Sequence, residues 1–175
     1  MAQAVSNATS APLKNTILIG EASVPIRADE FQKIVSDAIE SETEAHAFYT
    51  SAAGKVRDRG LKTLFRDLAG EELEDREFLE RYRSTEPRVM KFEVHDYKVT
   101  DSLKTPDLSA DMKPLEGMVL AIKRELESMT RNRQLAETTT DPGRKKLYTD
   151  LAAMAQANKG RLEDIYTNMA FPEAW

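Results

Sequence analysis

The stretch LFRDLAGEELEDREFL, residues 64–79, decides the fold because it places acidic residues on the apolar face of a helix. Inward positions separated by steps of four and three residues are typical of a helix packed in a core, and here they are 61, 65, 68, 72, 75, 79 and 82. Glu72 and Asp75 interrupt this otherwise apolar stripe. A buried carboxylate is costly unless something compensates its charge. The stretch therefore predicts a core helix that brings two carboxylates to a charge-balanced site.

The composition excludes several classes of protein. A chain of 175 residues with 41% hydrophobic and 31% charged residues is typical of one globular helical domain. Its net charge of −5 disfavours nucleic-acid binding, and the absence of cysteine excludes disulfides, thiolate catalysis and cysteine-bound zinc or iron. No apolar run reaches the length of about 18 residues that a membrane span needs, and residues 1–20 lack the basic region of a signal peptide. We expect a cytoplasmic protein.

Two helices are predicted before residue 84. Asp29 is the expected N-cap of the first, with Gln32 completing a capping box, and this helix runs to about residue 57. Residues 58–60 form a short turn, so the second helix, from about 61 to 83, is its antiparallel neighbour. The inward positions of the first helix are Phe31, Val35, Ala38, Glu42, Ala45, Tyr49, Ala52 and Val56.

Two further helices are predicted in the second half of the chain. Asp111 can cap the third helix, which tolerates Pro114 in its first turn, and Asp141-Pro142 is a strong start for the fourth. Their inward positions are Met118, Ala121, Glu125, Ser128, Asn132 and Leu135 in the third, and Tyr148, Leu151, Ala155, Asn158, Leu162 and Ile165 in the fourth. Residues 84–111 do not follow a helical pattern, so they are predicted to form a long crossover that makes helices two and three parallel.

The predicted fold is an all-α, antiparallel four-helix bundle. Its expected divisions are a flexible or extended arm over 1–27, a bundle over 28–168 with halves 28–83 and 112–168, the crossover over 84–111, and a C-terminal tail over 169–175. The charged residues expected on solvated faces are Glu71, Glu74, Glu77, Arg81, Lys123 and Arg124. A homodimer is the expected state, because long bundles with apolar arms often pair.

The two halves of the predicted bundle repeat each other. Residues 38–69 and 121–152 share 12 identities over 32 positions without a gap. A shared register across two helices and a turn predicts a duplicated helical hairpin, packed about a pseudo-twofold axis. The axis places Glu42 and Glu125 at equivalent heights on helices one and three.

Three segments of the chain resemble a known family. They are AIESETEAHAFYTSAA (38–53), LFRDLAGEELEDREFL (64–79) and AIKRELES (121–128). Together with the duplication and the crossover, they resemble the rubrerythrin-like branch of the ferritin-like superfamily over roughly residues 28–168. The resemblance implies a ferritin-like bundle that holds two irons between its helices and reduces peroxide or oxidises iron. Because the chain has no cysteines for the family's iron module, a redox cycle would need an external electron donor.

The resemblance also assigns metal ligands, and the resulting di-iron set is incomplete. The glutamates of the family's first three helices correspond to Glu42, Glu72 and Glu125. Asp75 replaces the histidine of the second helix, and the fourth helix has Ala155 and Asn158 in place of a glutamate and a histidine. Tyr49 is the candidate for hydrogen-bond support beside the metal, and no residue is assigned a catalytic role.

The acids at these positions favour a cation site built from oxygen ligands. Carboxylates suit hard cations such as Mn or Mg, and Fe or Zn can also bind, with fewer than two ions expected per chain. His46, one helical turn from Glu42, and Asn158 are weaker candidate ligands. Alternatively, no metal binds, and the acids share protons at raised pKa or pair with Arg76, Arg131 or Lys159.

Three hypotheses for the function follow from these residues. The first is a rubrerythrin-like metal-binding protein with a carboxylate-rich core site and a redox role in iron or peroxide handling. The second is a non-catalytic ferritin-like bundle that has lost its di-iron centre and acts as a structural or interaction module. The third is a metal shared across a dimer, with His46 or the N-terminal arm supplying ligands from outside.

Overall fold

The computed structural model describes residues 18–23, 25–95 and 97–172. Within them the helices are α1 (Ala28–Lys55), α2 (Arg59–Arg83), α3 (Pro114–Thr138) and α4 (Pro142–Ala170), and the strands are β1 (Leu18–Ser23) and β2 (Arg88–Lys91). The two strands pair in antiparallel fashion as a small ribbon beside the bundle. The predicted ferritin-like four-helix bundle is confirmed. Most of the predicted N-terminal arm and the end of the predicted tail lie outside the described residues.

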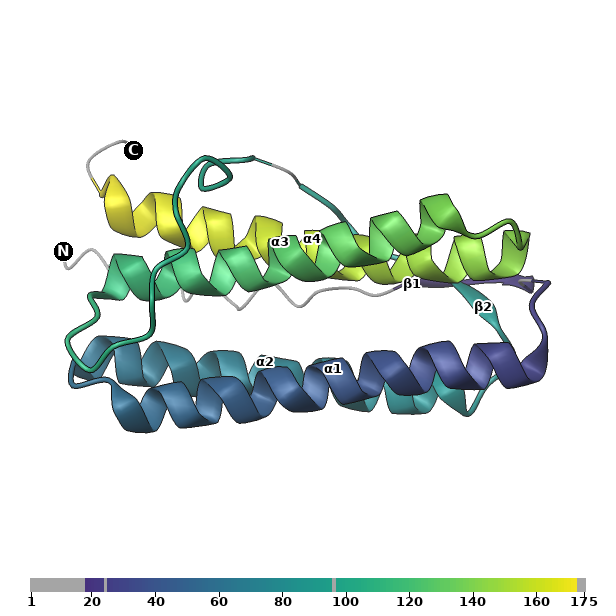
Figure 1. Cartoon of the computed structure of the whole chain (residues 1–175), viewed down its shortest axis with the longest axis horizontal. Helices are drawn as coiled ribbons and strands as arrows, with labels where there is room; N and C mark the ends of the chain where they lie inside the picture. Colours follow the sequence, from purple (N-terminus) through teal and green to yellow (C-terminus); the bar gives the residue numbers. More distant parts are fainter. Residues whose placement is uncertain (1–17, 24, 96, 173–175) are drawn as a thin grey trace, which may run out of the picture.

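The bundle consists of two helical hairpins stacked as two layers. Helices α1 and α2 form one layer, and α3 and α4 form the other (Figure 1). The connection from α2 to α3 returns along the length of the bundle, so these two helices run in the same direction (Figure 1). The backbones pack closely within each hairpin, whereas α1 meets α4 and α2 meets α3 only locally. Side chains between the layers therefore decide how well the centre is filled.

The second helix of each hairpin begins at an aspartate N-cap, and the two aspartates occupy equivalent positions in the repeat. The Asp58 carboxylate accepts a hydrogen bond from the backbone N–H of Leu61 at 2.8 Å, and the Asp141 carboxylate accepts one from Arg144 at 2.7 Å. Each aspartate satisfies a first-turn N–H that the helix itself leaves without an acceptor. The predicted start at Asp141 is confirmed. The predicted short turn between the first two helices is present, but it covers residues 56–58 instead of 58–60, because α2 already begins at Arg59.

The other two predicted caps are wrong. Helix α1 begins after Arg27, so Asp29 lies inside its first turn, where a carboxylate is favoured by the helix dipole without capping it. Helix α3 begins after Lys113, whose backbone N–H donates to Glu116 at 2.7 Å. Because Pro114 occupies the first helical position, the cap must be the residue directly before it, and Asp111 instead pairs with Arg57 at 2.6 Å.

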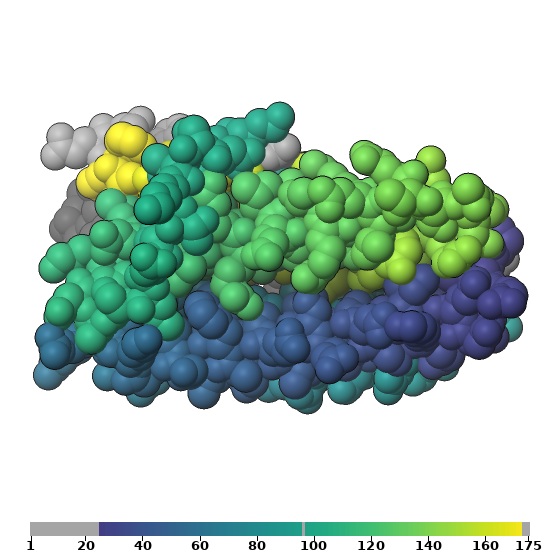
Figure 2. All heavy atoms as spheres, in the orientation of Figure 1, coloured from purple at the N-terminus to yellow at the C-terminus, as the bar shows by residue number. Residues whose placement is uncertain are grey.

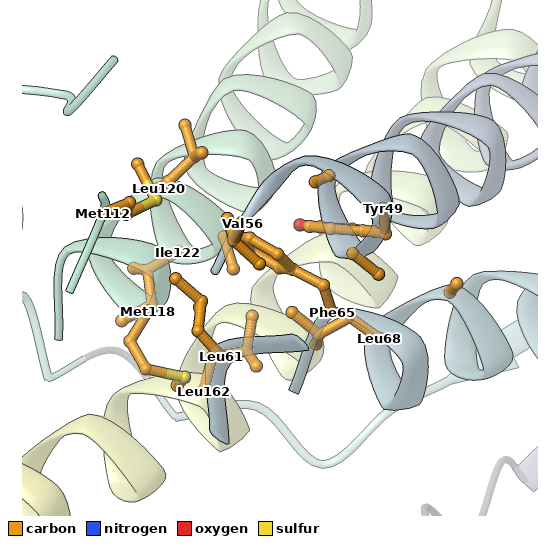
Figure 3. Close-up of a cluster of buried hydrophobic side chains, with 14 residues drawn as sticks. Tyr49, Val56, Leu61, Phe65, Leu68, Met112, Met118, Leu120, Ile122 and Leu162 are labelled. Carbon is orange, nitrogen blue, oxygen red and sulfur yellow. The ribbon is translucent and has the colours of Figure 1, made fainter. Parts of the chain in front are cut away.

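Two apolar clusters form the core at opposite ends of the bundle. The Tyr49 cluster, drawn in Figure 3, contains Tyr49, Ala52, Ala53, Val56, Leu61, Phe65, Leu68, Ala69, Met112, Met118, Leu120, Ala121, Ile122 and Leu162. The Tyr82 cluster contains Phe31, Ile34, Val35, Phe78, Leu79, Tyr82, Met90, Leu147, Leu151 and Met154. The middle turns of α1, α2 and α3, between the two clusters, carry Glu42, Glu72 and Glu125.

Two positions predicted to point inward are exposed. Leu135 is 39% exposed because it lines an opening between the two layers. Ile165 is 36% exposed because the inward face at the end of α4 passes through Leu162 and Tyr166, which pack on the Tyr49 cluster. The four-and-three spacing therefore gives the wrong face where a helix leaves the centre of the bundle.

The connection between α2 and α3 is held against α4 by a buried lysine. Lys159 is fully buried and forms ion pairs with Asp101 at 3.1 Å and Glu163 at 3.0 Å. At Gly160, an added Cβ would lie 2.8 Å from the carbonyl oxygen of His95, so only glycine allows this close approach. Over the described ranges, no helix combines the length and hydropathy needed to cross a membrane.

Alanine substitutions at the two confirmed caps test the structural repeat. Asp58→Ala and Asp141→Ala should each lower the free energy of unfolding by about 1 kcal/mol, because each leaves a first-turn N–H without its acceptor. Asp29→Ala is the control, with an expected loss of only about 0.3 kcal/mol from the helix dipole. Urea unfolding followed by circular dichroism measures all three. A loss at Asp29 equal to the other two would contradict this assignment of the caps.

Candidate metal centre

The four predicted acids gather in the layer between the two apolar clusters. Glu42 comes from α1, Glu72 and Asp75 from α2, and Glu125 from α3. Glu72 is 5% exposed and Glu125 is 9% exposed. The charges of Glu72 and Asp75 act on both Glu42 and Glu125, so the acids are near neighbours. Three helices thus contribute acids to one region of the bundle, and the role of these acids as metal ligands stays a prediction.

Glu42 and Glu72 share a hydrogen bond and, with it, a proton. Burial, followed by the hydrogen bond to Glu72 and its negative charge, raises the pKa of Glu42 well above its usual range. Burial raises the pKa of Glu72 to about 7, although the hydrogen bond from Glu42 acts in the opposite direction. Two carboxyl groups can share a hydrogen bond only if one of them carries a proton, so the pair holds one proton between them. One proton thus removes part of the repulsion between these two carboxyl groups.

Glu125 has no such partner. Burial raises the pKa of Glu125 well above its usual range, and the charges of Glu72 and Asp75 raise it further. Arg161 and Arg124 act in the opposite direction through their charges. Within the described part of the chain, the Glu125 carboxyl group has neither a hydrogen bond nor an ion pair. A buried carboxyl group in this state favours a proton or a bound cation.

Asp75 and Asn158 bond to each other across the pseudo-twofold axis. The side-chain amide of Asn158 donates to the Asp75 carboxylate at 2.8 Å, and the two residues are 83 positions apart, the offset of the sequence repeat. Burial raises the pKa of Asp75 to about 6, while this hydrogen bond and the charge of Arg161 lower it. Asn158 therefore serves as a hydrogen-bond partner of an acid, which is a different role from that of a metal ligand.

Two arginines supply the positive charge near the acids, and sequence analysis did not assign them to the site. The Arg124 guanidinium lies over the Phe48 ring at 4.0 Å from its centroid and 5.7 Å from that of Tyr49. Arg161 binds the Glu71 carboxylate through both terminal nitrogens, at 2.8 and 2.5 Å. The expectation that Arg124 and Glu71 lie on solvated faces is therefore wrong. The available signal is position, since Arg124 precedes Glu125 and Arg161 follows Asn158 by three residues.

The cations predicted as alternative partners of the acids bind elsewhere. Arg76 pairs with Glu80 at 3.4 Å, and Arg131 donates to the Ser41 hydroxyl at 3.1 Å. Lys159 is held by Asp101 and Glu163. Long side chains can reach several partners, and here each of these three cations contacts a group other than the four acids.

His46 and Tyr49 lie on the same helix as Glu42 and flank the acids. His46 Nδ1 donates to the carbonyl oxygen of Ala69 at 2.7 Å, which directs this ring nitrogen to α2. Tyr49 is fully buried between the rings of Phe48 and Phe65. The Tyr49 hydroxyl has no hydrogen-bond partner in the described residues, and burial raises its pKa well above the usual range. The Tyr49 hydroxyl is therefore a buried group without a hydrogen-bond partner, close enough to Glu125 and Glu72 to feel their charges.

The acids can be reached through two hollows between the layers. One cavity of about 310 Å³ lies between α1, α3 and α4, and a second of about 230 Å³ lies between α1, α2 and α3. Glu42 and Glu125 line both. In the space-filling view, the surface is hollowed between α1 and α3 near the middle of the bundle (Figure 2). The buried acids are thus open to small solutes.

Comparison with known proteins agrees with this arrangement of helices. The Rubrerythrin family model matches residues 33–171. The chain belongs to the rubrerythrin family. Among solved structures, a hypothetical protein from Pyrococcus furiosus shares 20% identity, covering 83% of this chain and 93% of that chain, with a TM-score of 0.45. No curated protein matches the chain.

This rubrerythrin-family chain does not fit the two irons that the family implies. A di-iron bundle takes carboxylates from all four helices and imidazoles from two of them. Here α4 supplies Ala155 and Asn158, and Asn158 is already bonded to Asp75. Among residues 18–23, 25–95 and 97–172, no group of three or more His, Asp or Glu side chains is arranged to hold a metal ion.

The raised pKa of Glu72 predicts how the stability of the metal-free protein depends on pH. In the folded state the pKa is about 7, against 4.5 when unfolded, so the folded state binds more protons between these values. This stabilisation is complete below pH 4.5 and is lost as the pH rises through 7. In the presence of a chelator, the free energy of unfolding of the wild type should therefore fall relative to that of Glu72→Gln between pH 5 and pH 7, by about 1.4 kcal/mol per pH unit, and thermal melts at each pH measure this difference.

Glu74→Gln is the matched control, because Glu74 is exposed on the same helix. Its difference in melting temperature from the wild type should stay constant over the same pH range. A Glu72→Gln variant that follows the wild type at every pH would contradict the raised pKa of Glu72.

Proposed function

We propose that this rubrerythrin-family protein binds one divalent cation at Glu42, Glu72 and Glu125. The observation that carries the proposal is that Glu125 is buried without a partner beside two carboxyl groups that share one proton. A divalent cation can displace protons from clustered carboxylates and neutralise them more completely than Arg124 and Arg161 do, because it contacts the carboxylate oxygens directly. Binding requires the three side chains to turn toward one point and to release their protons.

The proposed donor set selects the class of metal. Three carboxylates without an imidazole suit Mn²⁺ or Mg²⁺ best, while Fe²⁺ and Zn²⁺ are accepted less selectively. The smaller hollow, lined mainly by polar side chains of α1, α2 and α3, is the proposed path for the ion. An iron- or peroxide-dependent redox role would further require an external electron donor, because the chain has no cysteine for a second iron site.

The second candidate function is a metal-free structural or interaction module. The hydrogen bond between Asp75 and Asn158 supports it, because this bond satisfies an acid that would otherwise need a cation. The shared proton of Glu42 and Glu72 acts in the same way. In this function the bundle would serve as one half of a homodimer, which stays a prediction, or as a docking partner.

Metal content and thermal stability distinguish the two candidates. Protein purified without chelator should contain up to one equivalent of a divalent metal, as measured by inductively coupled plasma mass spectrometry. Adding Mn²⁺ at about 100 times its dissociation constant should stabilise the fold by about 2.7 kcal/mol. The resulting rise in melting temperature should be larger at pH 8 than at pH 5, because protons compete for the same carboxylates.

Two variants make the metal experiment specific. Glu125→Gln should abolish most of the Mn²⁺-induced rise, whereas Glu137→Gln, at an exposed residue of the same helix that lines neither hollow, should preserve it. Metal content below about a tenth of an equivalent, together with no rise for the wild type at pH 8, would exclude the cation site and leave the metal-free module.

A further inference from the structure

The larger hollow has two chemically different ends. Its volume of about 310 Å³ lies at the lower limit of small-molecule sites, which range from about 300 to 1,000 Å³. Apolar side chains line the end toward the Tyr82 cluster, namely Ile34, Ala38, Leu135, Leu151 and Met154. Glu42, Glu125 and Asn158 line the other end. Such a cavity suits an amphipathic solute better than a bare ion.

Glu125 is the polar group that this cavity leaves unsatisfied. It is nine-tenths buried, it lines the cavity, and the described residues offer its carboxyl group no hydrogen bond or ion pair. A buried acid of this kind is stabilised by a donor that brings positive charge. Asn158 cannot supply this donor, because its amide donates to Asp75.

Ala155 supplies the room for the apolar part of a solute. It is buried in the inward face of α4 and lines the cavity beside Asn158. Its methyl group leaves open the volume that a longer side chain would occupy between Glu125 and Met154. The cavity holds about ten waters at about 30 Å³ each, which is enough space for a chain of about six carbons.

The charges around the cavity favour a cation over an anion. Asp37, Glu40 and Glu44 line it toward solvent, together with the single basic residue Arg131. The Arg131 guanidinium is bonded to the Ser41 hydroxyl at 3.1 Å, so it is already engaged on this side of α1. Acidic walls raise the local concentration of cationic solutes and repel anionic ones.

We propose that this cavity binds a small primary alkylammonium ion, with its –NH₃⁺ group on Glu125 and Glu42 and its alkyl chain along Ala155 toward Met154. An ammonium group carries three hydrogen-bond donors, which matches two neighbouring carboxyl groups. The apolar end of the cavity gains free energy in proportion to the alkyl area removed from water. This ligand class goes beyond the divalent cation of the proposed function, because a bare ion makes no use of the apolar end.

Calorimetric titration of the full chain with three six-carbon probes tests the proposal. The probes are hexylammonium, 1-hexanol and hexanoate, at pH 8 with a chelator present, so that the result does not depend on metal binding. Hexylammonium should bind at least tenfold more tightly than hexanol, and hexanoate should show no binding. Equal affinities for hexylammonium and hexanol, or no binding of hexylammonium, would overturn the proposal.

Variants of the cavity wall and of the acid provide the second test. Ala155→Leu and Ala38→Leu, on α4 and α1, should each weaken hexylammonium binding more than tenfold while keeping the Mn²⁺ response, because both residues line only the larger hollow and the three carboxylates remain. Ala153→Leu, on α4 outside the cavity lining, is the matched control and should bind as the wild type does. Glu125→Gln should remove the preference for hexylammonium over hexanol. Wild-type affinity in both wall variants, or a preserved preference in Glu125→Gln, would exclude the site.

Discussion

The burial of neighbouring carboxyl groups in the middle of the bundle is the constraint on which the rest of the structure depends. Glu42, Glu72 and Glu125 each lose hydration on folding and each repel the others, so the folded state raises their pKa values. The structure relieves this cost in part with a shared proton between Glu42 and Glu72 and with the charges of Arg124 and Arg161. Glu125 takes no part in the shared proton, so burial and the charges of its neighbours are opposed there only by the two arginines.

The apolar ends of the bundle make this burial possible. The Tyr49 and Tyr82 clusters supply the hydrophobic free energy of folding at two separate levels. The layer between them can therefore carry polar groups without the loss of the fold. The loose contact between the hairpins keeps these polar groups accessible, because α1 and α3 do not close over the acids and two hollows remain.

The sequence predicts most of the scaffold and only part of the site. The inward positions of α2, from Leu61 to Tyr82, follow from a spacing that every turn of a packed helix must obey, and all seven lie inward. The acids Glu72 and Asp75 can be predicted as site residues because they interrupt that apolar spacing. The positions of the Arg124 and Arg161 guanidinium groups cannot be predicted from the spacing, because a long side chain on the flank of a helix can bend toward the core or away from it. The caps at Asp29 and Asp111 fail for a related reason, because a cap depends on where the backbone turns, and several residues could have served.

The loss of side chains from α4 changes which positive groups the acids can hold. With one proton between Glu42 and Glu72, and Asp75 satisfied by Asn158, the acids that remain to be neutralised are mainly Glu72 and Glu125. One divalent cation or one ammonium ion can meet this demand, whereas a second divalent ion would find too few carboxylates and no imidazole. At the same time, Ala155 leaves open the space that an additional ligand side chain would fill. The same substitutions that remove a di-iron site thus create an amphipathic cavity beside the surviving acids, and a metal ion and an alkylammonium ion would compete for them.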